Sequence, residues 1–166
     1  MSNYIEAEPL VVSKLKDIVI ERKFDLPATA VWKAWTDPVS LKKWWGPKDF
    51  ICSYSSIDLR AGGTYLNCMV SPKGEEFWST GVYIEVSPYN RLVFTNSFSD
   101  DEGKIVPASA LNMPGDWPLQ LLITLGFEED GDQTIMYLRQ KGVPAEMHAV
   151  RLGGWNQSFD KLAAIG

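Results

Sequence analysis

Apolar and polar residues alternate along the stretch from Asp17 to Asp25. Ile18, Ile20 and Phe24 fall on one side of an extended chain, and most of the charged residues fall on the other. This alternation predicts a half-buried strand. Arg22 falls on the apolar side, which leaves two interpretations open. Its charge either reaches back to water at the strand end, or points into a cavity and is paired there.

Two short helices are predicted directly after this strand. Pro27 opens the first, which runs through Trp35. Asp37 is the expected N-cap of the second, and Pro38 its first helical residue. This second helix is expected to run to about Trp45 and to stop at Gly46-Pro47.

Turn signals then recur at the spacing of an antiparallel meander. Glycine, proline and asparagine clusters separate segments rich in apolar and β-branched residues, and the segment before Gly62-Gly63 pairs with the next as a hairpin. A further hairpin follows later in the chain. The predicted strands span residues 50–59, 64–71, 77–86, 91–97, 119–127 and 134–140.

The segment from Ser99 to Pro118 interrupts this rhythm with acidic residues, glycines and prolines. A structureless loop of about twenty residues is uncommon in a compact domain, and such loops often serve as lids. We therefore expect a loop that gates a site.

The last predicted element is a long amphipathic helix opened by Pro144. Its apolar face combines Leu152, Trp155, Phe159 and Leu162, with His148 one turn upstream. Gly153-Gly154 lies in its middle, at a cost of about 1 kcal/mol per glycine relative to alanine. This cost suggests a close approach to the helix or a need for space beside it.

One antiparallel sheet needs a cover for its apolar face, and the last helix is the only long amphipathic helix available. The sequence therefore predicts an α+β fold, in which a curved antiparallel sheet of about six to seven strands wraps around the C-terminal helix. The two short helices close one end. Residues 1–16 are expected to form a flexible lead-in, and residues 17–166 a single domain.

A series of local motifs runs along the chain at residues 19–27, 31–38, 41–47, 58–63, 81–86 and 88–94, and at Gly154-Trp155 followed by Leu162. Through these motifs, residues 17–165 resemble the START-like, helix-grip superfamily (SRPBCC), and within it the family named after the activator of the heat-shock-protein-90 ATPase. The resemblance implies a helix-grip fold with a deep cavity between the sheet and the C-terminal helix. It is specific for fold and weak for function, because such domains serve many roles. Residues 99–114 depart from the family pattern.

Composition and charge exclude several classes of protein. The 166 residues are 45% hydrophobic and 22% charged, with a net charge of −5, which suits a globular chain without a nucleic-acid-binding face. No stretch is long and apolar enough to span a membrane, and the N-terminus does not read as a secretory signal. The expected location is cytoplasmic. Cys52 and Cys68 lie on neighbouring predicted strands and are expected to be buried free thiols.

Catalytic motifs are scarce. His148 is the single histidine, so a site of several histidines is excluded, and neither a metal nor a cofactor is expected. It is either a partly exposed helix residue or a base or ligand contact inside the cavity. Glu85 faces either solvent or the interior, and in the second case Arg22 is its expected partner.

Aromatic residues make up 12% of the chain, which suits either a well-filled core or a cavity for a flat ligand. We favour the cavity because the resemblance supports it. The face that each strand turns inward is not fixed, because a slip of one residue inverts the set. The predicted ligand-binding residues are Arg22, Trp44, Trp45, Tyr65, Asn67, Met69, Trp78, Glu85, Met147, His148 and Trp155.

Three functions follow from this reading. The favoured one is a binding domain for a small hydrophobic or aromatic molecule. The second is a co-chaperone-like domain that acts on a heat-shock-protein-90 type ATPase. The third is a cyclase or hydrolase with His148, Arg22, Glu85 and Tyr65 as candidate groups; the chain offers no pair of base and nucleophile, so it ranks last. A chaperone ATPase and a second copy of the chain, as a homodimer, are the candidate protein partners.

Overall fold

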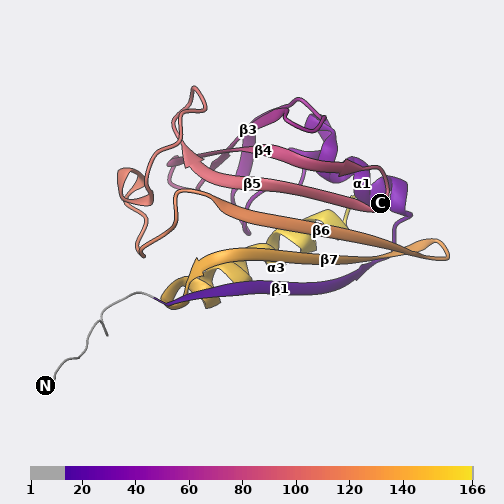
Figure 1. Ribbon diagram of the computed structural model, residues 1–166. Coiled ribbons are helices and arrows are strands. Elements are labelled where there is room, and N and C mark those ends of the chain that lie inside the picture. The colour runs from indigo at the N-terminus through magenta and orange to yellow at the C-terminus, as the bar shows by residue number, and fades with distance from the viewer. Residues whose placement is uncertain (1–13, 166) are drawn as a thin grey trace, which may run out of the picture.

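A computed structural model describes residues 14–165 and contains one seven-stranded antiparallel sheet (Figure 1). The strand order is β1-β7-β6-β5-β4-β3-β2, so the first two strands form opposite edges. The predicted antiparallel sheet is therefore confirmed. The strands are β1 (Leu15–Phe24), β2 (Ile51–Ile57), β3 (Thr64–Val70), β4 (Glu76–Ser87), β5 (Arg91–Ser99), β6 (Leu121–Asp130) and β7 (Gln133–Pro144).

Two short helices follow β1, as predicted. They are α1 (Ala28–Thr36) and α2 (Pro38–Leu41), and the Asp37 side chain caps α2 by accepting a 3.0 Å bond from the Ser40 N–H. The expected end of the second helix near Trp45 is wrong, since α2 stops at Leu41. The Trp44 indole turns into the core and donates to the Ala34 carbonyl at 2.9 Å, and the backbone continues as turns.

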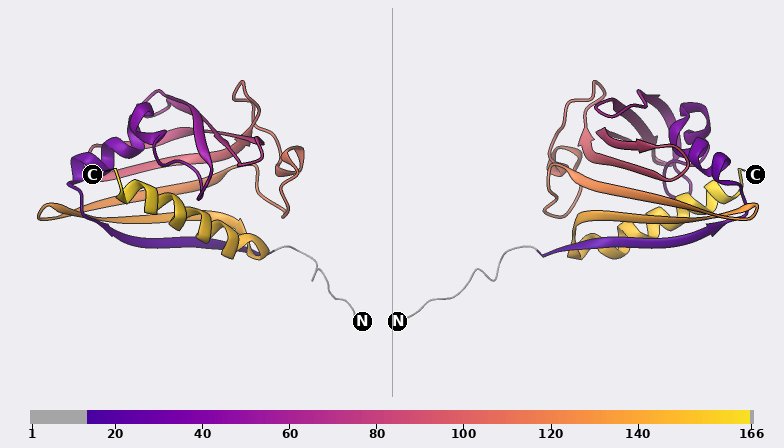
Figure 2. Two further views of the ribbon diagram at one scale, coloured as in Figure 1. Left: turned by 180° about the vertical axis from the view of Figure 1, so that it is seen from behind. Right: turned by 45° about the vertical axis from the view of Figure 1, so that its right-hand side comes forward.

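The C-terminal helix lies along one face of the sheet (Figure 2). A short 3-10 turn, η3 (Ala145–Met147), leads into α3 (His148–Ala163). Trp155, Phe159 and Leu162 are buried and Leu152 is half-buried, so the predicted apolar face is confirmed. The helix-grip arrangement follows, because the sheet curves around the buried side of α3.

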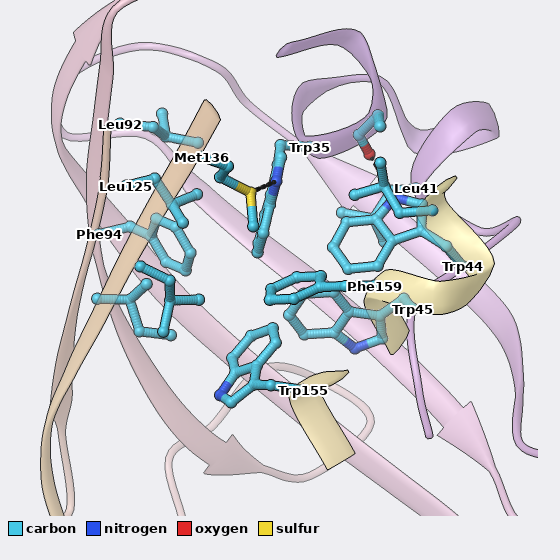
Figure 3. Close-up of a cluster of buried hydrophobic side chains, with 14 of the residues drawn as sticks. Trp35, Leu41, Trp44, Trp45, Leu92, Phe94, Leu125, Met136, Trp155 and Phe159 are labelled. Carbon is cyan, nitrogen blue, oxygen red and sulfur yellow. Dashed lines mark hydrogen bonds between the residues drawn. The ribbon is translucent and has the colours of Figure 1, made fainter. Parts of the chain in front are cut away.

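A dense aromatic cluster fills the space beneath the second half of α3 (Figure 3). Trp35 lies at its centre, with ring centroids 4.7 Å from Trp44 and 6.0 Å from Phe159. Its indole N–H points at the Met136 sulfur, 3.3 Å away. Interiors packed at this density leave little free volume. This half of the sheet–helix interface is core.

Residues 99–118 do not form a structureless loop. Ser99 and Ile105 form an isolated β-bridge, and η2 (Ala108–Leu111) makes one 3-10 turn. The segment lies at the end of the sheet where α3 begins (Figure 1). It therefore borders the half of the helix that the aromatic cluster leaves uncovered.

Most of the predicted N-terminal lead-in lies outside the described residues, and Leu15 and Lys16 already belong to β1. Within residues 14–165, no helix combines the length and the apolarity needed to cross a bilayer.

Candidate functional site

A pocket of about 240 Å³ opens where the first half of α3 meets the sheet. Its walls come from five parts of the chain: η3, α3, the segment after α2, strands β3 to β5, and the 99–118 segment. Most of its lining is apolar, which is typical of small-molecule sites. The lining residues are Trp45, Gly46, Pro47, Phe50, Met69, Phe77, Trp78, Ser79, Asn96, Phe98, Met113, Trp117, Met147, Val150, Arg151, Gly154, Trp155 and Ser158.

The helix wall depends on Gly154. A Cβ at this position would lie 3.6 Å from the Pro47 Cγ, which is ordinary van der Waals contact, so the glycine leaves space rather than relieving a clash. Lys161 holds the opposite segment in place, because its Nζ donates to the carbonyls of Pro47 and Phe50 at 3.2 and 3.1 Å. A Cβ on Gly153 would meet no atom of the described residues within 4 Å. The sequence offered two explanations for this glycine pair: a group that approaches the helix closely, or a need for space beside the helix. The first explanation is therefore wrong.

The 99–118 segment forms the second wall through Trp117. Its indole N–H donates to the Pro114 carbonyl at 2.8 Å, and its ring meets Phe98 edge-on at 5.6 Å. Gly115 has φ +100°, and a Cβ there would lie 2.9 Å from the Met147 Cγ. Glycine is thus required for the close approach of this segment to the start of α3.

Arg151 completes this corner of the pocket. The guanidinium carbon lies 4.6 Å from the centroid of the Trp117 ring. Burial lowers the pKa of this guanidinium from its ordinary value to about 10. Sequence reasoning missed both residues. The available signal was position, because Arg151 precedes Trp155 by four residues and so shares its side of the helix.

The sheet wall follows from the register of β3 and β4. Asn67 pairs with Ser79 and Met69 with Phe77, and paired residues point to the same face. Trp78 belongs to the opposite face, and its ring lies 5.6 Å from that of Tyr54. The face of β4 that the sequence left open is therefore the one with Phe77 and Ser79 on the pocket side, and the predicted residue Trp78 still borders the pocket.

The structure brings only part of the predicted site together. Five of its eleven residues line the pocket: Trp45, Met69, Trp78, Met147 and Trp155. Their role in binding stays a prediction.

Three others, Trp44, Tyr65 and Asn67, are core residues. Trp44 is fully buried and does not lie at a cavity mouth. The Tyr65 hydroxyl donates to the Thr95 carbonyl at 2.9 Å and accepts from Asn96 Nδ2 at 2.8 Å. Burial raises the pKa of Tyr65 far above its ordinary value. The void beside Tyr65 and Asn67 measures about 10 Å³, too small for a ligand.

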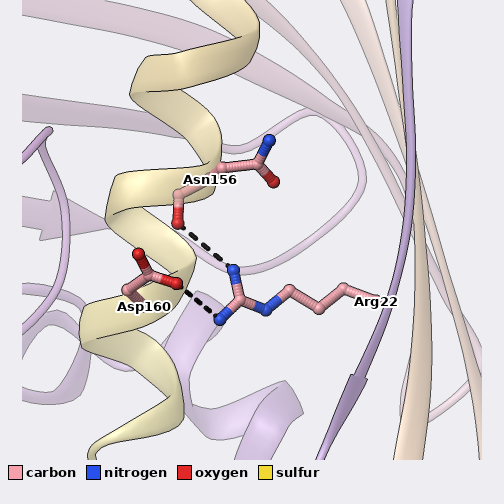
Figure 4. A network of polar contacts seen from close by, with 3 residues as sticks. All are labelled: Arg22, Asn156 and Asp160. Atoms are coloured by element: carbon pink, nitrogen blue, oxygen red, sulfur yellow. Dashed lines mark hydrogen bonds and ion pairs between the residues drawn. The ribbon is translucent and has the colours of Figure 1, made fainter.

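The suggested Arg22–Glu85 pair is wrong. The Arg22 Nη2 lies 2.7 Å from the Asp160 Oδ1, and its Nη1 donates to the Asn156 carbonyl at 3.2 Å (Figure 4). Arg22 therefore joins β1 to α3 near solvent. Glu85 accepts from Arg91 Nε at 3.1 Å on the sheet surface.

His148 also lies away from the pocket lining. Its Nε2 is 3.0 Å from the Asp17 carbonyl oxygen, which can only accept, so this nitrogen carries the proton. The histidine thus ties the start of α3 to β1. The four candidate catalytic groups occupy separate places, and nothing in the described residues joins them into one site.

Both cysteines are buried free thiols. A register shift between Cys52 and Tyr54 places Met69 opposite Cys52, and Cys68 opposite Tyr54. Burial raises the pKa of the Cys52 thiol to about 11 and also raises that of Cys68. Both thiols are therefore protonated and unreactive near neutral pH.

Solved structures share this fold at low sequence identity. A protein from Chromobacterium violaceum is 26% identical, with a TM-score of 0.71 over 90% of this chain and 95% of that one. A protein from Arthrobacter aurescens is 21% identical, with a TM-score of 0.74 over 91% and 89%. The AHSA1 protein of Silicibacter pomeroyi is 24% identical, with a TM-score of 0.70 over 90% and 96%. No curated protein matches the chain.

A family model agrees with the fold. The model described as activator of Hsp90 ATPase homolog 1-like protein matches residues 25–166, which is most of the chain. The resemblance carried by the sequence motifs is thereby confirmed. The chain belongs to the family of activator of Hsp90 ATPase homolog 1-like proteins, within the START-like superfamily.

Proposed function

We propose that this protein binds a small, largely apolar molecule in the pocket beside the first half of α3. The observation that carries the proposal is a pocket of about 240 Å³ whose walls are mainly aromatic rings, methionines and small residues. Sites for drug-sized ligands typically measure about 300–1,000 Å³, so this one suits a small ligand. The START-like fold supports a binding role of this kind.

The adjacent glycines of α3 provide a matched test. Leucine at position 154 would project into the pocket, whereas leucine at position 153 would not line it. Both changes improve helix propensity by a similar amount. We expect Gly154→Leu to weaken binding of the neutral fluorescent probe N-phenyl-1-naphthylamine by about tenfold or more, and Gly153→Leu to leave it unchanged.

Titration with the probe measures binding to both variants, and circular dichroism shows whether they are folded. Together the two measurements distinguish a blocked pocket from a loss of folding. A native-like Gly154→Leu variant that binds as well as Gly153→Leu would show that the probe binds elsewhere. The whole proposal would be contradicted if the unmodified chain showed no saturable binding of the probe and no bound species in native mass spectrometry with a lipid and aromatic library.

The family description favours a second candidate, a co-chaperone-like domain that acts on an Hsp90 ATPase. Its test is the ATPase rate of the chaperone with and without this chain. An unchanged rate and no co-purification would remove it. A cytoplasmic location agrees with both candidates and with the free thiols of Cys52 and Cys68, because cytosolic thiols are kept reduced.

A further inference from the structure

Among the described residues that line the pocket, a single side chain is charged. This residue is Arg151, and no aspartate or glutamate of residues 14–165 joins it there. The chain as a whole carries a net charge of −5. A solitary cation in an apolar pocket of an acidic protein is therefore a specific feature of this site.

Arg151 has no acidic partner within residues 14–165. Its guanidinium makes none of the ion pairs found there, and it donates none of the side-chain hydrogen bonds. Every other arginine of the chain pairs with a carboxylate in this structure. The guanidinium presents a planar set of N–H donors that matches a carboxylate in two-point contact.

Trp117 fixes the direction of this group. The guanidinium lies over the indole face, at 4.6 Å from the ring centroid, and the indole is itself held by Pro114 and Phe98. Stacking of this kind stabilises the cation through the ring face and leaves the N–H edge available. A side chain held in place before the ligand arrives loses less entropy on binding.

Helix stability does not explain the arginine. Arg151 lies in the first turn of α3, where the helix dipole disfavours a cation and favours an anion. Desolvation adds a further cost, as its lowered pKa indicates. An anionic ligand placed at the guanidinium would offset both costs.

We propose that the ligand is a small monocarboxylate, an aromatic or aliphatic acid whose carboxylate pairs with Arg151 while its apolar body fills the rest of the pocket. The body would lie against Phe77, Phe98 and Trp155, which share the pocket with the guanidinium. This inference rests on the proposed binding function and names the chemistry of the ligand.

The test compares an acid with its neutral isostere. Calorimetric titration with 2-naphthoate and 2-naphthamide at neutral pH changes one functional group and keeps the apolar body. We expect the acid to bind about ten- to hundredfold more tightly than the amide, the usual range for a hydrogen-bonded charged pair.

Three variants assign that preference to one residue. Arg151→Met should bring the affinity for the acid down to that for the amide, whereas Arg151→Lys should retain part of the preference. Arg60→Met removes an equal charge from an exposed arginine outside the pocket and should change neither affinity. Thermal unfolding checks that each variant is folded. If Arg151→Met does not fold, the reduced preference of Arg151→Lys for the acid over the amide decides the assignment.

The outcomes separate the two proposals. Equal affinity for acid and amide in the unmodified protein, or a preference that survives in Arg151→Met, overturns the carboxylate assignment while apolar binding stands. Absence of binding for both compounds, together with failure of the neutral-probe test at Gly154, removes the binding function itself.

Discussion

The Trp155 indole N–H donates a 2.8 Å hydrogen bond to the buried side-chain oxygen of Gln140. This bond joins α3 to β7 at the border between the pocket and the aromatic cluster. Gln140 is fully buried, and its Nε2 has no hydrogen-bond partner among the described residues. One bond therefore satisfies one end of an amide that has no contact with water.

Removal of the donor leaves the whole amide unpaired, so Trp155→Phe should lower the free energy of unfolding by about 1–3 kcal/mol for the lost bond, besides the lost packing. Gln140→Met removes the acceptor but also the unpaired Nε2, so it should cost less. Urea unfolding of both variants measures the two costs. A larger loss for Gln140→Met would contradict this account of the pair.

Alanine at position 153 should stabilise the protein. The position is inside α3 and a Cβ there meets nothing within 4 Å, so Gly153→Ala gains helix propensity without a clash. We expect the free energy of unfolding to rise by about 0.5–1 kcal/mol. Gly81→Ala is the contrasting control, because its Cβ would overlap the Thr95 carbonyl oxygen and must displace the backbone. A loss of stability in Gly153→Ala would show that the position has a contact we have not identified.

The Arg22–Asp160 ion pair should contribute little to stability despite its short distance. The Asp160 side chain is 69% exposed, and exposed pairs contribute about 0–1 kcal/mol. Asp160→Asn is expected to lower the free energy of unfolding by less than about 1 kcal/mol, and high salt should reduce that difference. A loss of several kcal/mol, insensitive to salt, would show that the pair is effectively desolvated.

The Cys52 thiol should lose its proton at a higher pH than an ordinary cysteine thiol. Its folded pKa of about 11 lies above the ordinary value of 9.0, because burial disfavours the thiolate. The folded chain therefore holds this proton more tightly than the unfolded chain. The resulting stabilisation is complete below pH 9 and is lost as the pH rises toward 11.

Alkylation by iodoacetamide in a Cys68→Ser background follows this titration directly. The rate should rise steadily between about pH 7 and about pH 10 without a plateau, because the thiolate fraction keeps growing. Urea-unfolded protein serves as the control and should level off near the ordinary pKa. A plateau of the folded protein at that same pH would contradict the burial effect.

The sequence predicted the elements well where local signals were strong. Alternation in β1, the Asp37-Pro38 start of α2 and the apolar face around Phe159 all correspond to observed structure. The end of α2 was missed because a distant contact decides it. Trp44 leaves the helical path to donate to Ala34, and no spacing rule contains that bond.

The site was harder to predict, for two physical reasons. A slip of one residue in β4 exchanges Phe77 for Trp78, and periodicity alone does not fix which of them faces inward. Arg22 and His148 bond to partners far away in the sequence and do not line the pocket. Such pairings depend on the tertiary structure. The aromatic excess itself was ambiguous, since the structure uses it both for a filled core and for pocket walls.

The pairing of β1 with β7 has a consequence for synthesis of the chain. Phe24 lies opposite Thr134, and Leu15 lies opposite Pro144. The strand β1 therefore cannot pair until β7 has left the ribosome. Contacts between residues so far apart in the chain form slowly, and an unpaired strand edge is prone to aggregate. Cellular yield of this protein should therefore depend on how well the growing chain is shielded until β7 has emerged.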